Sequence, residues 1–190
     1  MPEQRIAVVI GSTRPTRICA DIAAWACDTI QDGSELSYEL LDLAKVSLPF
    51  LDEPLKAALH QYQHEHTKRW SAIVSSFDAF FFVFPQYNWG YPAVLKNALD
   101  FLYDEWRDKP ATFATYGTRG GSRAAAQFSS ILTGLHMKEL PAHLELVITD
   151  NDVDEDWQLI DIEATLGSYR EQIRGIDAQL AEALHTGSDS

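Results

Sequence analysis

Short apolar runs alternate along this chain with longer stretches in which apolar residues recur every three or four positions. The runs are rich in β-branched and aromatic residues and predict five strands, at residues 5–11, 35–43, 78–84, 110–117 and 143–148. The stretches between them predict helices, because that spacing places side chains on one helix face. The run at 78–84 is apolar almost throughout, which is typical of a strand covered on both faces.

The alternation of strands and helices predicts a single α/β domain over residues 1–190. Five strands joined by helices fit a parallel sheet in the flavodoxin-like three-layer α/β/α fold, with strand order 2-1-3-4-5. Residues 55–76 are expected to be helical, in one or two pieces. Apolar residues spaced three or four apart predict a C-terminal amphipathic helix at about 157–185. We expect this helix to dock on the sheet, with a subunit interface as the alternative.

The chain is acidic, with a formal net charge of −13. This charge disfavours nucleic acid and anionic membranes as partners, but it allows a small anionic ligand at a local positive patch. No apolar run reaches the ~18 residues of a membrane-spanning helix. The first residues lack the basic, apolar and small-residue regions of a signal peptide. We therefore expect no membrane partner and a cytoplasmic location.

The two cysteines, Cys19 and Cys27, lie on one predicted helix. Eight residues of helix span ~12 Å, which is too far for a disulfide between them. We interpret both as small buried residues, with a redox role for the thiols as the alternative.

The loop between the first strand and the first helix has the composition of a phosphate site. Its sequence, GSTRPTR at residues 11–17, places hydroxyl groups and two arginines beside a helix N-terminus, where free N–H groups attract anions. It has neither the Gly-Lys-Ser/Thr of nucleoside triphosphatases nor the Gly-x-Gly-x-x-Gly of dinucleotide-binding folds. A single terminal phosphate, as on a mononucleotide, fits it better. The alternative is a capped helix whose arginines are solvated.

Two further loops leave strand ends near the point where the strand order reverses, which is where such sheets bind ligands. PQYNWGYP at 85–92 offers flat aromatic surface, amides and an asparagine to a heteroaromatic ring. GTRGGSR at 117–123 allows close backbone approach, and its N–H groups could hold a carbonyl or an anion. Each loop alone also has an ordinary structural explanation, such as packing on a neighbouring loop or subunit. Together the three loops describe a site for flavin mononucleotide (FMN).

These motifs resemble those of the NADPH-dependent FMN reductase family, the flavodoxin-like group that contains quinone, azo-dye and chromate reductases. The family's Gly-Ser-x-Arg loop is similar to residues 11–14. Its long Pro-Glu-Tyr-Asn-x-x-x-Pro-x-x-Leu-Lys-Asn-Ala-x-Asp segment is similar to residues 85–100, and its glycine-rich loop is similar to residues 117–123. The resemblance covers about residues 5–146.

The resemblance implies which residues hold FMN. They are Ser12, Thr13, Arg14, Arg17 and Ile18 at the phosphate, Pro85, Gln86, Tyr87 and Asn88 along the ring, and Gly117, Gly120 and Gly121 at the pyrimidine edge. Lys96, Asn97 and Asp100 would brace a helix and a subunit contact. The chain departs from the family pattern at Gln86, where glutamate is usual, and at residues 18–19, where glycine, serine or asparagine is common.

The resemblance also implies an enzyme, an FMN-dependent NAD(P)H oxidoreductase. Hydride would pass from NADPH or NADH through flavin N5 to a small acceptor. This acceptor would be a quinone or a similar species, such as a free flavin, an azo compound or a metal ion. The flavin carries this chemistry, so we assign no catalytic side chain; backbone N–H groups would stabilise negative charge at its N1–C2 carbonyl edge. The family further implies a homodimer with flavin near the interface, or a dimer of dimers.

Two other functions stay open at this point. One is a flavodoxin-like one-electron carrier, whose flavin NAD(P)H alone would not reduce. The other is a flavin-free relative of the same fold that serves in an interaction.

Three remaining features are expected to be structural. His60 and His64 lie four residues apart, but their surroundings do not match the His-Glu-x-x-His pattern, so we expect no metal site. Residues 149–157 are acidic, yet they lack the central glycine and final glutamate of a calcium loop, and we expect a solvated linker. Asp42 ends the second strand without a dinucleotide fingerprint nearby, and we expect it to have a structural role.

Overall fold

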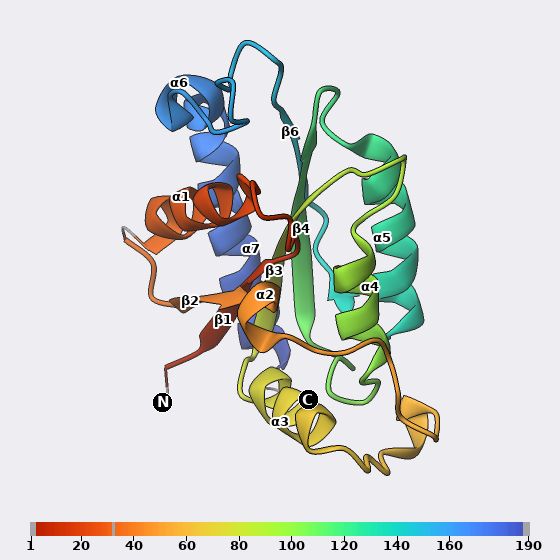
Figure 1. The fold of residues 1–190 in the computed structure, drawn as a ribbon. Coiled ribbons are helices and arrows are strands. Elements are labelled where there is room, and N and C mark those ends of the chain that lie inside the picture. The colour runs from red at the N-terminus through yellow and green to blue at the C-terminus, as the bar shows by residue number, and fades with distance from the viewer. Residues whose placement is uncertain (1–2, 32, 188–190) are drawn as a thin grey trace.

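The computed structural model describes residues 3–31 and 33–187. Its parallel sheet has the order β2-β1-β3-β4-β5, with β6 also paired to β4, which confirms the expected flavodoxin-like fold (Figure 1). The strands are β1 (Arg5–Ile10), β2 (Ser37–Asp42), β3 (Ala79–Pro85), β4 (Pro110–Gly117), β5 (Lys138–Glu139) and β6 (Leu144–Val147).

Helices cover both faces of the sheet (Figure 1). On one face lie α1 (Cys19–Gln31), α6 (Ile162–Leu166) and α7 (Arg170–Gly187), and on the other lie α3 (Glu65–Ser75), α4 (Ala93–Asp100) and α5 (Ser122–Gly134). The short elements are α2 (Leu43–Val46) and the 3₁₀ turns η1 (Ala57–Leu59) and η2 (Gly167–Tyr169). Within the described residues, no helix is both long and apolar enough to cross a membrane.

Strand β3 lies at the centre of the sheet and is buried along its whole length. Its side chains alternate between the two cores. Phe81 and Val83 pack in the core under α1 and α7, whereas Phe80, Phe82 and Phe84 pack in the core under α3, α4 and α5. The continuous apolar run is therefore explained by helices on both faces.

The fifth position of the sheet is divided between two short strands. β5 pairs with the start of β4 and β6 pairs with its end. Between them lies Pro141, which has no N–H to donate to the ladder. The hydroxyl of Thr112 on β4 instead donates to the carbonyl of Ala142 at 2.7 Å. The sequence predicted β6 and missed β5.

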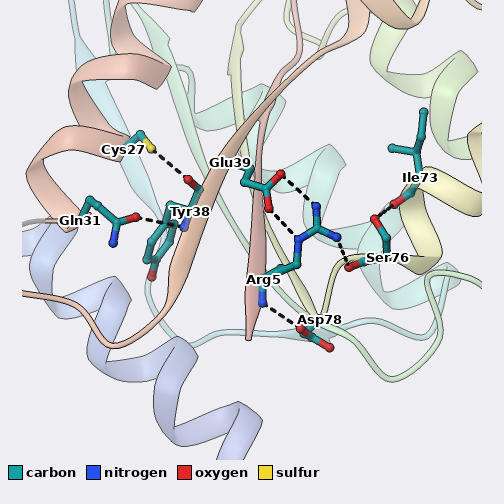
Figure 2. Close-up of polar contacts among 8 residues, drawn as sticks. All are labelled: Arg5, Cys27, Gln31, Tyr38, Glu39, Ile73, Ser76 and Asp78. Carbon is teal, nitrogen blue, oxygen red and sulfur yellow. Dashed lines mark hydrogen bonds and ion pairs between the residues drawn. The ribbon is translucent and has the colours of Figure 1, made fainter. Parts of the chain in front are cut away.

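Arg5 joins three strands at the amino ends of the sheet (Figure 2). Its Nε and Nη2 donate to the Glu39 carboxylate on β2, at 2.6 and 2.9 Å. Its Nη1 donates to the Ser76 carbonyl, and its backbone N–H donates to Asp78 just before β3, at 3.1 and 2.8 Å. This polar cluster links the amino ends of the strands, at the end of the sheet opposite the candidate site.

One of the helical predictions needs an adjustment. The C-terminal helix does not begin near residue 157 but at Ile162, and η2 divides it into α6 and α7. Trp157 has φ of 60°, in the left-handed region, which a helix cannot continue through, and Asp161 caps α6 by accepting from the Ala164 N–H at 2.9 Å. Residues 55–76 form two pieces, η1 and α3.

Candidate functional site

A cavity of about 300 Å³ opens at the carboxyl ends of the strands. It is lined by the loop after β1 (Arg14, Thr16, Arg17, Ile18), the turn after β3 (Pro85, Gln86, Tyr87), the end of β4 (Tyr116, Gly117, Thr118) and the segment after β6 (Ile148, Thr149, Asp150, Val153, Trp157). The three loops singled out in the sequence therefore meet at one cavity, as the switch-point rule for such sheets requires.

Seven of the twelve predicted site residues line this cavity. They are Arg14, Arg17, Ile18, Pro85, Gln86, Tyr87 and Gly117. Thr13 lines a neighbouring cavity instead. Ser12 is fully buried, Asn88 lies in the turn after β3, and Gly120 and Gly121 are buried in the turn before α5.

Ser12 connects two of the loops. Its Oγ lies 2.9 Å from the Tyr87 hydroxyl, in a hydrogen bond that either group can donate. The guanidinium of Arg14 lies over the Tyr87 ring, 6.0 Å from its centre. The loop after β1 is thus tied to the aromatic ring that lines the cavity.

Arg17 is the most restrained cation of the cavity. Its Nη2 donates to Asp42 Oδ2 at 2.7 Å, and Asp42 Oδ1 accepts from the Ala44 N–H at 3.0 Å, at the start of α2. The Arg17 side chain is 19% exposed, and its Nε is buried without a hydrogen-bond partner. An orphaned buried donor on an arginine at this cavity fits an anionic group such as a phosphate.

Residues 87–90 form a tight turn after β3. Tyr87 and Gly90 exchange backbone hydrogen bonds at 2.8 and 2.9 Å, and Asn88 and Trp89 both have positive φ, as in a type I′ turn. Trp89 does not line the cavity; it is 63% exposed and the Arg123 guanidinium stacks 3.8 Å from its ring centre. Of the aromatic residues in this turn, it is therefore Tyr87 that offers a flat surface to the cavity.

Gln86 caps helix α5. Its Oε1 accepts from the N–H groups of Arg123 and Ala124, at 3.2 and 3.1 Å. Glutamine thus performs the capping that a glutamate oxygen could perform at this helix N-terminus, but without a negative charge at the cavity.

Removal of this cap should weaken the fold. We expect Gln86→Ala to lower the free energy of unfolding by about 1 kcal/mol, the usual cost of losing an N-terminal cap. Gln86→Glu keeps an acceptor oxygen and should be at least as stable as the wild type, because a carboxylate interacts favourably with the helix dipole. Urea unfolding measures both, with Gln172→Ala on the exposed face of α7 as the matched control. Equal destabilisation by alanine and glutamate would contradict the capping role.

The glycine-rich loop brings backbone close to the site. Gly120 and Gly121 have φ of 75° and 85°, and a Cβ on Gly121 would overlap the Thr115 hydroxyl. Glycine is therefore needed at this turn for both conformation and space.

Cys19 lies beneath the cavity with its Sγ 3.1 Å from the Val83 carbonyl. Burial raises the pKa of its thiol to about 12, so it stays protonated at neutral pH. Burial likewise raises the pKa of Tyr116 far above the ordinary value. Both cysteines are free thiols, and neither is a ready nucleophile.

None of His60, His64 and His66 lines the cavity. His60 Nδ1 lies 3.6 Å from Glu105, whereas His66 Nε2 lies 2.9 Å from Asp52. In residues 3–31 and 33–187, no three His, Cys, Asp or Glu side chains are grouped to hold a metal ion.

The sequence missed the fourth wall of the cavity. Asp150, Val153 and Trp157 belong to the acidic stretch expected to be a solvated linker, yet they line the cavity. The signal that could have found them is topological, because the loop after the fifth strand leaves from the same edge of the sheet as the other three.

Comparisons with known proteins agree with this geometry. The family described as NADPH-dependent FMN reductase matches residues 4–149. The NAD(P)H-dependent FMN reductase LOT6 of Saccharomyces cerevisiae is 41% identical over 144 residues, which cover 70% of this chain and 75% of that protein. A 2-hydroxy-1,4-benzoquinone reductase of Burkholderia sp is 25% identical over 147 residues, 76% of this chain and 73% of that protein.

Among solved structures, the flavoenzyme NAD(P)H:(acceptor) oxidoreductase FerB of Paracoccus denitrificans has the same fold, with a TM-score of 0.71 at 21% identity, over 95% of this chain and 98% of that one. The family match covers most of the chain and includes all three predicted loops. The chain belongs to the NADPH-dependent FMN reductase family, whose enzymes use FMN as cofactor and NAD(P)H as electron donor.

Proposed function

We propose that this enzyme passes hydride from NADPH or NADH through FMN, held at this cavity, to quinones or similar small acceptors. The observation that supports this best is the orphaned Nε of Arg17 beside an aromatic and glycine-lined cavity. A buried donor without a partner is rare in proteins, and an anionic ligand would satisfy it. The 25% identical benzoquinone reductase supports quinones as the acceptor class.

In this proposal each loop has a distinct role toward FMN. Arg14 and Arg17, with the N–H groups before α1, hold the phosphate. Residues 85–88 line the ring, and residues 117–121 approach its pyrimidine edge. Ser12 positions the Tyr87 ring through its hydrogen bond rather than through exposed contact. When bound, FMN supplies the hydride-transfer chemistry at its N5 atom.

The chain's own residues bind and orient the reactants. Tyr116 stays protonated because burial raises the pKa of its hydroxyl, so it is no base at neutral pH. In the glycine-rich loop the Gly120 N–H donates to the Gly117 carbonyl and the Arg123 N–H donates to Gln86, so the backbone N–H groups of residues 118, 119 and 121 are the donors proposed to stabilise negative charge at the ring edge.

Steady-state kinetics with a panel of acceptors tests the proposal. The purified enzyme with FMN should oxidise NADPH or NADH faster when a quinone is added, and the panel should include an azo dye, a ferric complex and free FMN. If free FMN accelerated NAD(P)H oxidation and none of the quinones did, free flavin would replace quinones as the proposed acceptor. No NAD(P)H oxidation with any acceptor would overturn the proposal and favour a one-electron carrier.

We also propose that the enzyme acts in the cytoplasm as a homodimer or a dimer of dimers. A protruding aromatic side chain supports the assembly. Phe50 is 86% exposed, and Asn97 on α4 holds the chain on both sides of it, donating to the Pro49 carbonyl at 2.7 Å and accepting from the Leu51 N–H at 3.0 Å. Single exposed apolar side chains are common, but Phe50 is the most exposed large apolar residue in the described part of the chain, and its backbone is held on both sides.

A charge at this position should break the assembly. We expect Phe50→Asp to convert the tetramer to dimers or the dimer to monomers, because an aspartate cannot be buried at an apolar contact without a partner. Sedimentation velocity measures the change. The matched control is Leu59→Asp, at a half-exposed leucine of the neighbouring turn. A wild type that is monomeric at micromolar concentration would contradict the proposed assembly itself.

A further inference from the structure

The segment after β6, residues 149–160, is an ordered arm rather than a loose linker. The Asp152 carboxylate accepts from both the backbone N–H and the hydroxyl of Thr149, each at 2.7 Å. The Asp154 carboxylate accepts from the N–H groups of Asp156 and Gln158, each at 2.9 Å. Two of the acidic residues are therefore hydrogen-bond acceptors that shape the backbone.

Backbone pairing closes this arm into a hairpin-like turn. The Asp154 N–H donates to the Gln158 carbonyl at 2.9 Å, and the Ile160 N–H donates to the Asp152 carbonyl at 3.0 Å. Val153 and Leu159 face each other in an antiparallel bridge. The arm therefore holds its side chains in place over the cavity.

Trp157 occupies an unusual position on this arm. It has φ of 60°, a left-handed conformation that is rare for a bulky residue, and it is 58% exposed while lining the cavity with Val153. Backbone strain of this kind persists only where surrounding contacts impose it, and it clusters at functional sites. An exposed indole held at a cavity offers a flat surface for stacking.

The charge around this surface is negative. Asp150 lines the cavity, Asp154, Glu155 and Asp156 lie on the arm, and the sequence from 139 to 169 contains no lysine or arginine. The arginines that line the cavity, Arg14 and Arg17, lie on the loop after β1 and would be engaged by the FMN phosphate. The surface beside Trp157 is thus suited to uncharged rings and unfavourable for anions.

We propose that Trp157 and Val153 form one wall of the subsite for the electron acceptor, and that this subsite takes planar uncharged quinones in preference to sulfonated ones. This inference rests on the proposed function. The family match ends at residue 149, so the wall lies outside the segment that defines the family. In the reaction a quinone gains a hydride, which NAD(P)H supplies through FMN, and a proton from water, and it becomes the hydroquinone.

Binding without turnover tests the wall. The oxidised holoenzyme, without NAD(P)H, is titrated with 1,4-naphthoquinone, and the change in flavin absorbance reports the Kd. Trp157→Ala should raise this Kd, and the KM for the same quinone, by about 5- to 30-fold, because it removes an aromatic stacking surface. Trp157→Phe retains a ring and should stay within about 3-fold of the wild type. The Kd for FMN and the KM for NADPH should not change.

Three outcomes would overturn the inference. One is an unchanged Kd and KM for naphthoquinone in Trp157→Ala. Another is a loss confined to the KM for NADPH, which would assign the wall to the nicotinamide. The third is an equal loss in FMN affinity, which would assign it to the cofactor. Failure of the proposed function is distinguishable, because the wild type would then bind no FMN or would not be reduced by NAD(P)H.

A matched acceptor pair tests the charge preference. 1,4-Naphthoquinone-2-sulfonate carries the same ring with one negative charge. Asp150→Asn should lower the KM for the sulfonated quinone by about 2- to 5-fold relative to the KM for the parent quinone, because one nearby repulsion is removed. Asp28→Asn, at an exposed position on α1, removes the same charge away from the cavity and serves as the control. Equal effects of Asp150→Asn on both quinones would refute the charge preference.

Discussion

Replacing Arg17 by glutamine should weaken FMN binding about 10- to 100-fold and leave riboflavin binding nearly unchanged. The arginine lines the cavity, it is oriented by Asp42, and its Nε has no partner in the protein. A hydrogen bond to a charged group contributes about 1.5–3 kcal/mol, and glutamine retains neither the charge nor the fork of donors. Fluorescence titration of the apoprotein with each flavin gives the two Kd values.

Riboflavin is the internal control for this variant because it has the same ring and no phosphate. Arg174→Gln, at an exposed position on α7 away from the cavity, is the matched control for loss of a positive charge. An equal loss of affinity for both flavins would place Arg17 at the ring rather than at the phosphate. Unchanged FMN affinity would remove Arg17 from the site.

Replacing Gly121 by alanine should lower the free energy of unfolding by about 3 kcal/mol. The backbone φ of 85° is unfavourable for any residue with a Cβ, which costs roughly 1–2 kcal/mol. The new methyl group would also overlap the Thr115 hydroxyl on β4, and overpacking of this kind costs about 1–3 kcal/mol. For a chain of this size we expect the Tm to fall by roughly 10 °C in calorimetry.

Gly134→Ala is the control for this substitution. It lies at the end of the same helix, and a Cβ there meets no atom within 4 Å. Alanine should leave the Tm unchanged or raise it slightly, because it restricts the unfolded chain. If both alanine variants had the same Tm, the close approach of Gly121 to β4 would not be a source of stability.

The fold was predictable because its signals are local. Apolar runs and helical spacing locate β1, β2, β3, β4 and β6, and their alternation with helices fixes a parallel sheet. The two residues of β5 carry no such pattern. They pair with Pro110 and Ala111 on β4, which is a contact between segments far apart in the sequence.

The site was predictable only in part, because many of its contacts join segments that are far apart in the sequence. Loop positions follow from topology, so the convergence of three loops could be expected. The burial of Ser12 depends on Tyr87, 75 residues away, and the role of Asp42 depends on Arg17. Asp152 and Asp154 read as solvated charges in the sequence, whereas the structure uses them to shape the arm that carries Trp157. Tertiary contacts decide these cases, and composition does not reveal them.

The most direct test of the central claim is an anaerobic titration of the FMN-loaded enzyme with NADPH, and in parallel with NADH, followed by visible absorbance. One equivalent of a nicotinamide cofactor should bleach the flavin band, and one equivalent of 1,4-naphthoquinone should restore it. A bound flavin that neither cofactor bleaches, or a protein that retains no FMN at all, would contradict that claim.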